Sequence, residues 1–240
     1  MSVKQRPGFA VSVERTVQST AKKSVFFDIR PATNTNFRFL PSYNAEGDLF
    51  FASAQHHNFK EDGEKRSWAC LRVHGTEGQD CPICLLVEAA VETDEAKFGK
   101  LISAHKLAER WHAQVVALPK GEGEEVEQVS VIGLSKMTAA DVSAILKMEK
   151  DNRQPLLTDP DQGQAVNISR NDKPGLQTRY KVQATGLRTS LDTVYPKWTE
   201  EFLDLPKAVA LRVVEPERII ASIQETVGNN VFRTLLPNLA

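Results

Sequence analysis

The residues best suited to chemistry lie in the segment 56–84, which holds all three cysteines of the chain and three of its five histidines. Cys81 and Cys84 form a CxxC motif, and Cys70 precedes this motif by eleven residues. A CxxC turn directs two thiolates at one ion, and a more distant Cys and His can complete a tetrahedron. Four protein ligands leave no open coordination position. The pattern therefore predicts one structural zinc ion rather than a catalytic one.

The fourth ligand is open on spacing alone. His57 would give the pattern H-x12-C-x10-C-x2-C with the three cysteines. His74 lies between Cys70 and the CxxC motif and would give a C-x3-H pair instead, and His56 is also within reach. Spacing does not choose between His57 and His74.

Three other interpretations of the cysteines are weaker. A thioredoxin-like redox pair opens a helix after a strand in a βαβ unit and needs no third Cys. Free cysteines can also simply be buried in a core. A disulfide framework is disfavoured because the number of cysteines is odd and no secretory signal is visible.

The elements that must position these residues are mainly strands. Short runs rich in Phe, Val and Ile, separated by Pro, Asn and Gly, are typical of strands, and they occur at 24–30, 36–41, 48–55, 111–119, 126–134, 164–171 and 178–185. Helical spacing follows the CxxC motif, and a capping box at Thr138–Asp141 predicts a second helix. Five to seven short strands with a helix among them suit a mixed, mainly β fold such as an OB-fold Greek-key barrel, and periodicity alone does not distinguish this fold from another α+β barrel.

The domain organisation follows from these elements. Residues 1–24 are basic and without a clean period, so we expect a flexible N-terminal arm. Residues 25–190 are expected to form the OB-fold core, with the zinc-binding lobe inserted at about 55–90. Residues 191–240 are expected to form a helical C-terminal segment.

Charge is unevenly distributed in a chain whose net charge is −1. Residues 1–30 carry six basic and two acidic side chains, and residues 131–189 carry nine and six, whereas the segment 119–130 has a net charge of −3. Two basic regions in a nearly neutral chain can form a binding groove, and solvated charge mixed over the surface is an equally good interpretation.

No motif indicates catalysis. A P-loop is absent, GEGEEV at 121–126 lacks the third glycine of the dinucleotide pattern, and neither GxSxG nor HExxH occurs. We therefore expect no enzyme. No apolar stretch approaches eighteen residues, so we expect a cytoplasmic protein without a membrane span.

Around the cysteines the sequence resembles one family, the T-even-type phage single-stranded-DNA-binding, or helix-destabilising, protein. The likeness rests on FRFLPSYN at 37–44, HHNFKEDG at 56–63 followed by Trp68 and Cys70, HG at 74–75, and CPIC at 81–84. It extends more weakly to WHAQVVALP at 111–119 and SRNDKPGLQTRYKVQAT at 169–185.

This resemblance implies that His57, rather than His74, joins Cys70, Cys81 and Cys84 as a zinc ligand, and that a zinc ribbon is inserted into an OB barrel beside a DNA cleft. It implies a phage protein, in the cytoplasm of the bacterial host, that coats exposed single strands without sequence preference during DNA replication, recombination and repair. It also implies self-association along DNA through the N-terminal arm. The family's long acidic tail has no counterpart here, so contacts with replication and recombination proteins are a weaker expectation.

Coating a single strand needs cations for the phosphates and rings for the bases. We predict these nucleic-acid contacts: Arg38, Tyr43, Lys60, Trp68, Lys106, Arg110, Trp111, Lys136, Arg170, Arg179, Tyr180, Lys181 and Arg188. The cations of the hairpin from Arg170 to Arg188 are favoured as a group, and Trp111 and Tyr180 are the expected stacking platforms. Two alternatives remain, a zinc-ribbon module that binds proteins of a replication or transcription complex and an OB protein that binds RNA.

Overall fold

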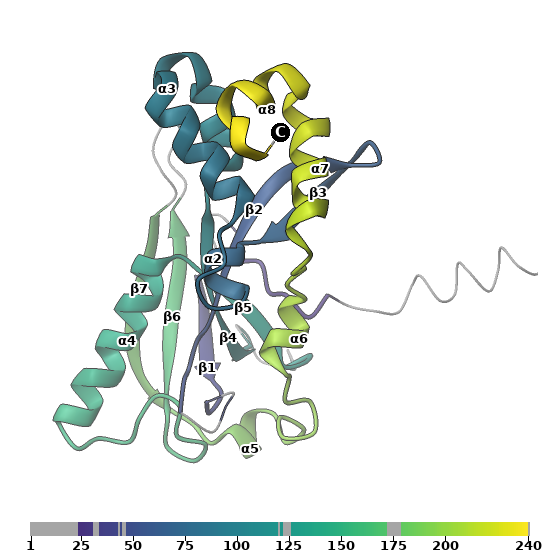
Figure 1. Ribbon diagram of the computed structural model, residues 1–240. Helices are drawn as coiled ribbons and strands as arrows, with labels where there is room; N and C mark the ends of the chain where they lie inside the picture. The colour runs from purple at the N-terminus through teal and green to yellow at the C-terminus, as the bar shows by residue number, and fades with distance from the viewer. Residues whose placement is uncertain are drawn as a thin grey trace, which may run out of the picture.

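The computed structural model describes residues 24–30, 34–42, 44, 47–119, 121, 126–171 and 179–239. Their strands form one seven-stranded sheet, and all pairings between these strands are antiparallel (Figure 1). The strands pair in the order β3-β2-β4-β1-β6-β7, and β5 pairs with β4 beside this path. The predicted mixed, mainly β fold class is confirmed. The predicted N-terminal arm lies outside the described residues up to position 23.

The elements have the following bounds. The strands are β1 (Asn34–Phe39), β2 (Phe51–Glu61), β3 (Glu64–Ala69), β4 (Ala108–Ala117), β5 (Ser130–Leu134), β6 (Gln164–Asn171) and β7 (Arg179–Arg188). The helices are α2 (Leu71–His74), α3 (Pro82–His105), α4 (Lys136–Asp151), α5 (Leu191–Val194), α6 (Leu205–Val209), α7 (Pro216–Val227), α8 (Asn229–Leu235) and the 3-10 turn η1 (Pro237–Leu239).

The sheet is not closed into the predicted barrel. Among the described residues β3, β5 and β7 each pair with one strand only, namely with β2, β4 and β6, so no pairing closes the sheet. Strand β2 changes partner along its length, because residues 51–55 pair with β4 while residues from Gln55 to Glu61 pair with β3. The second half of this long strand therefore leaves the main sheet and builds the lobe that holds the cysteines.

One hydrophobic core lies between the main sheet and α4. Side chains alternate along each strand, and those of one face, such as Phe37, Val115 and Ile168, pack with Val142 of α4. Ser135 caps this helix, because its hydroxyl accepts a hydrogen bond from the backbone N–H of residue 138 at 3.2 Å. The helix therefore begins before the predicted capping box, and it lies along β7 in Figure 1.

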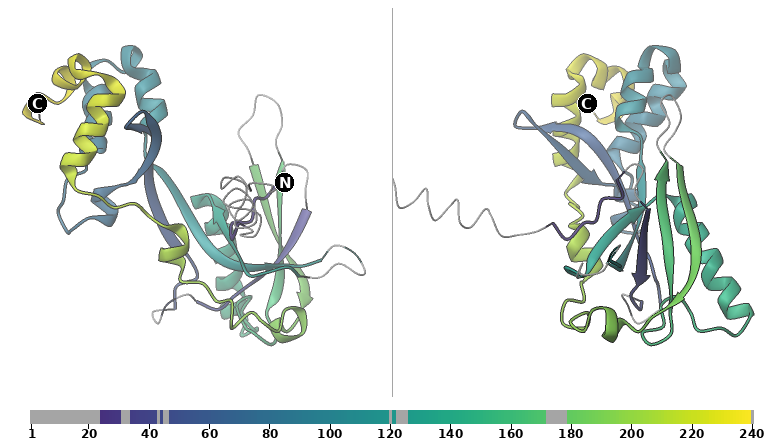
Figure 2. Two further views of the ribbon diagram at one scale, coloured as in Figure 1. Left: turned by 90° about the vertical axis from the view of Figure 1, so that its right-hand side faces the viewer. Right: turned by 180° about the vertical axis from the view of Figure 1, so that it is seen from behind.

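A second core surrounds the cysteines. Trp68 and Leu86 pack there with Ile223 of α7 and Phe232 of α8, and all four side chains are fully or almost fully buried. Figure 2 shows α3, α7, α8 and the β2–β3 hairpin grouped at one end of the molecule, away from α4, β6 and β7. Residues 191–239 contain α5 to α8 and η1. Helices α7 and α8 complete the core of the part formed by residues 55–105, which we call the metal lobe because it holds Cys70, Cys81 and Cys84.

Candidate metal centre and nucleic-acid interface

His56, Cys70, Cys81 and Cys84 form a cluster whose ligand atoms all lie within 4.8 Å of one another. The Cys84 Sγ lies 3.6 Å from the Cys70 Sγ and 3.4 Å from the His56 Nε2. Neighbouring ligand atoms around a tetrahedral zinc ion, with bonds of about 2.3 Å to S and about 2.0 Å to N, are roughly 3.5–3.8 Å apart. The four side chains could therefore hold one metal ion.

Strand β2 decides which histidine joins the cysteines. Consecutive side chains of a strand point to opposite faces, so His56 is buried at 1% exposure while His57 is exposed. A β-bulge between His56 and Phe59, with Asn58 at φ 65°, then shifts the alternation by one residue. The bulge leaves His56 and Phe59 both buried in the metal lobe.

The cysteines are positioned by helix starts. Cys70 precedes α2, Cys81 is the N-cap of α3, and Cys84 lies in the first turn of α3. The positive end of a helix dipole favours a thiolate over a thiol. The backbone N–H of Cys70 also donates to the carbonyl of Ala54 at 2.9 Å, which fastens this ligand to β2.

A backbone carbonyl fixes the tautomer of the ligating histidine. The Nδ1 of His56 lies 2.9 Å from the carbonyl oxygen of His105, so Nδ1–H donates and Nε2 faces the cysteine sulfurs, where it can bind a metal that displaces its proton. The Nδ1 of His105 in turn donates to the carbonyl of His57 at 3.0 Å, and its ring packs on Phe59 with centroids 4.2 Å apart. The end of α3 thus orients the histidine ligand on β2.

The pKa values of the clustered side chains also indicate that a bound cation would be favourable. Hydrogen bonds from Cys70 and Cys84 hold the pKa of the Cys81 thiol far below its ordinary value. Hydrogen bonds with Cys70 and Cys81 raise the pKa of Cys84, because they oppose a second thiolate. Burial lowers the pKa of His56, but its hydrogen bonds with Cys70 and Cys81 outweigh burial and raise it to about 9. A divalent cation would allow all three sulfurs to be thiolates.

The structure corrects the histidine of the predicted ligand set. His57 lies on the other side of the strand, with its Nδ1 2.7 Å from the Ser67 Oγ. The Nε2 of His74 accepts a hydrogen bond from the backbone N–H of Ala54 at 2.9 Å. Neither belongs to the cluster, so the prediction of His57 is wrong and His56 takes its place, while the three cysteines come together as predicted.

Two of the predicted nucleic-acid contacts are buried, since Arg38 and Trp68 are both 0% exposed. The Arg38 guanidinium donates to the carbonyls of Leu157 and Asp159 at 2.6 and 2.7 Å, and burial lowers its pKa to about 10. The Trp68 ring lies in the metal-lobe core, with the Arg212 Cζ 4.7 Å from its centre. Both side chains hold the fold together, so the prediction that they contact nucleic acid is corrected.

Two predicted cations of the β6–β7 hairpin are bound to the protein itself. Arg188 donates to the carbonyls of Pro155 and Gln162 at 3.1 and 2.8 Å. Arg170 donates to the carbonyl of Ile29 at 3.3 Å. These contacts fasten neighbouring segments to the hairpin. Two of the cations expected to contact phosphates there therefore already bind backbone carbonyls.

The other predicted contacts are dispersed. Tyr43 lies outside the described residues, and Arg179 is described only as the first residue of β7. Trp111 and Tyr180 are half-buried and pack against the core under α4. Five predicted cations are exposed, namely Lys60, Lys106, Arg110, Lys136 and Lys181. The structure places Arg110 and Trp111 on opposite faces of β4, so the predicted contacts do not form one surface.

The face of β2 and β4 that points away from α4 carries Phe51, Ser53, Arg110 and His112, and we call it the outer face. Strand pairing sets Phe51 opposite His112 and Ser53 opposite Arg110, so the four residues share one side of the sheet. Arg110 is exposed, and no salt bridge to it is found within the described part of the chain.

A row of rings crosses the outer face. The ring centroid of His112 lies 6.3 Å from that of Phe26 and 6.5 Å from that of Phe51, and Phe51 lies 6.4 Å from His74. Phe26 is 44% exposed and Phe51 is half-buried, whereas His112 beneath them is only 7% exposed. The sequence does not predict this row, because Phe26 and Phe51 fit the strand pattern and their alignment with His74 and His112 depends on strand pairing.

His112 is held as a neutral ring. Its Nε2 lies 2.8 Å from the Ser53 Oγ, and its Nδ1 has no hydrogen-bond partner among the described residues. Burial, together with the charge of Arg110, lowers its pKa to about 4. At neutral pH the outer face therefore presents uncharged rings beside one exposed guanidinium.

Comparison with known proteins assigns no family to the chain. No family model matches it, and no curated protein matches it. Within the described residues, none of the helices is both long enough and apolar enough to cross a membrane. The function therefore has to be argued from the geometry of the metal cluster and the outer face.

Proposed function

We propose that this protein binds single-stranded DNA without sequence preference, on the outer face and beside a structural zinc centre. The observation that carries the proposal is the row of rings formed by Phe26, His112, Phe51 and His74, with Arg110 exposed next to it. Every base has a π-face, so rings stack with bases whatever the sequence, while cations contact the phosphates.

Zinc is the proposed metal because thiolate and imidazole are its preferred donors and four of them fill its tetrahedron. Its role is structural. Its ligands come from β2 and from the starts of α2 and α3, so the ion would tie β2 to both helices. This is the strand that carries Phe51, so the ion would stabilise the proposed interface without touching the nucleic acid.

The finer fold assignment is a partly open OB-type domain. It is supported by the sequence resemblance and by the position of α4 between β5 and β6 in chain order. OB-type domains bind oligonucleotides on a face of their sheet. α4 covers one face of this sheet, so the outer face is the one we assign to the nucleic acid.

The proposed biological role is to coat single strands that become exposed during replication, recombination and repair, as the resemblance to the phage proteins implies. Single-stranded RNA offers the same bases and phosphates to a row of rings. The preference for DNA rests on the resemblance alone, and the experiment must therefore include RNA.

The test is a competition experiment read by fluorescence anisotropy. A labelled single-stranded DNA is displaced by unlabelled single-stranded DNA, duplex DNA or single-stranded RNA of equal length. We expect single-stranded DNA to compete best and duplex DNA worst, because duplex bases are already stacked on one another. If duplex competes equally well, stacking is not the mode of binding. If none of the three binds, the protein-interaction alternative replaces the proposal.

A further inference from the structure

A groove runs along α4 on the face of the sheet opposite to the outer face. It consists of two hollows of about 380 and 460 Å³ that share Gly47, Leu49 and Leu146. α4 forms one wall, and the segment 47–50 forms the other. We call this surface the α4 groove.

The groove follows α4 along almost its whole length. The residues of α4 that line it recur every three or four positions from Lys136 through Ser143 and Leu146 to Lys150. At about 1.5 Å per residue, this stripe is roughly 21 Å long. An extended peptide of about six residues spans the same length.

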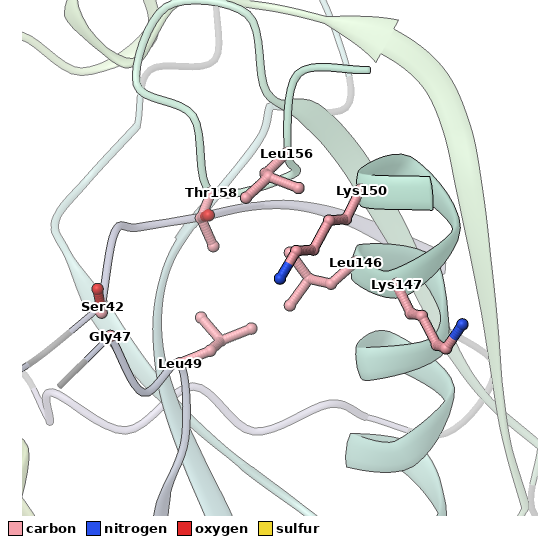
Figure 3. A pocket seen from close by; sticks show the side chains of 8 residues that line it. All are labelled: Ser42, Gly47, Leu49, Leu146, Lys147, Lys150, Leu156 and Thr158. Atoms are coloured by element: carbon pink, nitrogen blue, oxygen red, sulfur yellow. The ribbon is translucent and has the colours of Figure 1, made fainter. Parts of the chain in front are cut away.

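The floor of the groove is apolar and its charged lining is mainly basic. Figure 3 shows Leu49, Leu146 and Leu156 around the hollow at the Lys150 end, and Leu156 is 37% exposed. The side chains of Phe50 and Trp111 line the other hollow. The charged residues that line the two hollows are the lysines Lys136, Lys147 and Lys150 and one aspartate, Asp48.

The lysines differ in their availability. Lys147 points away from the hollow in Figure 3 and its Nζ lies 2.7 Å from the Asp151 carboxylate. Lys150 extends its amino group over the hollow, and within the described residues no ion pair is found for it or for Lys136. The groove thus offers one positive charge at each end of an apolar floor.

We propose that the α4 groove binds an acidic peptide segment of a partner protein, with apolar side chains on the leucine floor and carboxylates at Lys136 and Lys150. A nucleic acid is the poorer fit, because three leucines at the Lys150 end give a base neither a ring nor an edge to bond. The proposal goes beyond DNA binding and does not depend on it. The two surfaces lie on opposite faces of the sheet, so both ligands can be bound together.

The test uses a labelled peptide of about ten residues, with two central leucines and glutamates about six positions apart, and a copy with glutamine in place of glutamate. Binding to the full chain is measured by anisotropy. We expect the glutamate peptide to bind about tenfold more tightly than the glutamine peptide, and the double variant Lys136→Glu/Lys150→Glu to lose this difference.

The matched control is Lys65→Glu/Lys100→Glu, which makes the same change in net charge at exposed positions on the metal lobe. It should bind the peptide as the wild type does. Equal losses in both double variants, or equal affinity for both peptides, overturn the proposal. It is also overturned if the Lys136→Glu/Lys150→Glu variant keeps its preference for the glutamate peptide but loses more single-stranded DNA affinity than the control variant does, since the groove would then serve the nucleic acid.

Discussion

At the scale of single residues, the metal centre depends on which of two adjacent histidines faces the cysteines. His56 Nε2 lies 3.4 Å from the Cys84 Sγ, whereas His57 bonds to Ser67 on the exposed side of β2. The carbonyl of His105 fixes the tautomer of His56. Only one of the two rings is therefore both placed and oriented as a ligand.

This difference gives a direct prediction. His56→Ala removes a ligand, so its zinc affinity should fall by more than the roughly 10–100-fold that loss of an outer hydrogen-bond partner costs. His57→Ala is the matched control and should keep the wild-type affinity. Competition with a chromophoric chelator measures both. If His57→Ala lost zinc and His56→Ala kept it, the assignment from the structure would be wrong.

The sequence could locate the cysteines but not this histidine. The spacing predicts that Cys70, Cys81 and Cys84 bind one ion, because a CxxC motif and one further Cys suffice for that inference. Alternation along the strand gives opposite answers about which histidine is buried. Counting from the buried Ala54 places His56 inside, whereas counting back from the buried Phe59 places His57 inside. The bulge at Asn58 reconciles the two, and a bulge leaves no sequence signal of its own.

The neutral His112 predicts a loss of stability in acid. Its pKa is lowered to about 4 by burial, so the unfolded chain, with a histidine pKa near 6.5, binds the proton more readily. The stability that depends on the neutral ring is complete above about pH 6.5 and is lost as the pH falls toward 4. Linkage gives a loss of about 2 kcal/mol between pH 7 and pH 5.

Urea unfolding at pH 7 and pH 5, in the presence of zinc, measures this loss. The variant His112→Gln cannot take up the proton and should show a correspondingly smaller difference between the two pH values. Protonation of the metal ligands affects both proteins alike and cancels in the comparison. Identical pH dependence in the two proteins would contradict a buried neutral ring at position 112.

At the scale of elements, the metal lobe and the C-terminal helices form one unit. Ile219 and Ile223 of α7 and Phe232 of α8 share a core with Trp68 and the cysteines. The Trp68 Nε1 also donates to the Ser222 Oγ at 3.2 Å. A metal held by the cluster would therefore support residues that lie more than 130 positions later in the chain.

Chelation should consequently loosen more than the segment 55–90. We expect hydrogen exchange of α3, α7 and α8 to accelerate together when zinc is removed, because they lose a common core. Side chains of α4, β6 and β7 pack in the other core, so the amides of these elements should keep their protection from hydrogen exchange. Unchanged protection of α7 after complete zinc removal would show that the two parts are independent.

The elements themselves were largely predictable, and their long-range arrangement was not. Period-two runs marked most strands, and helical spacing marked α3. The open sheet could not be foreseen, because it depends on which strands pair, and pairings such as the change of partner of β2 at Gln55 join residues that are far apart in the sequence. The burial of Arg38 is similar, since the carbonyls of residues 157 and 159 that receive its guanidinium lie about 120 residues away. Local sequence does not encode such distant partners.

At the scale of the whole molecule, the two faces of the sheet are assigned different tasks. α4 and its groove occupy one face, and the row of rings with Arg110 occupies the other. The metal lobe lies at one end of the molecule (Figure 2). It contains the second half of β2, and the first half of this strand belongs to the main sheet. If single-stranded DNA binds on the outer face, as proposed, Arg110 and Phe51 contribute more to the binding affinity than Trp111, which lies on the opposite face.

The most direct test is the affinity for a short single-stranded oligonucleotide, titrated over a range of salt concentrations. The one phosphate neutralised by Arg110 predicts a log-log slope of at least roughly −0.7 for the wild type, and Arg110→Ala should make the slope shallower by about 0.7. Phe51→Ala should weaken binding by about 1–3 kcal/mol with little change in slope, and Trp111→Ala should weaken it less. An affinity that is flat with salt, or unaffected by both outer-face variants, would contradict the account.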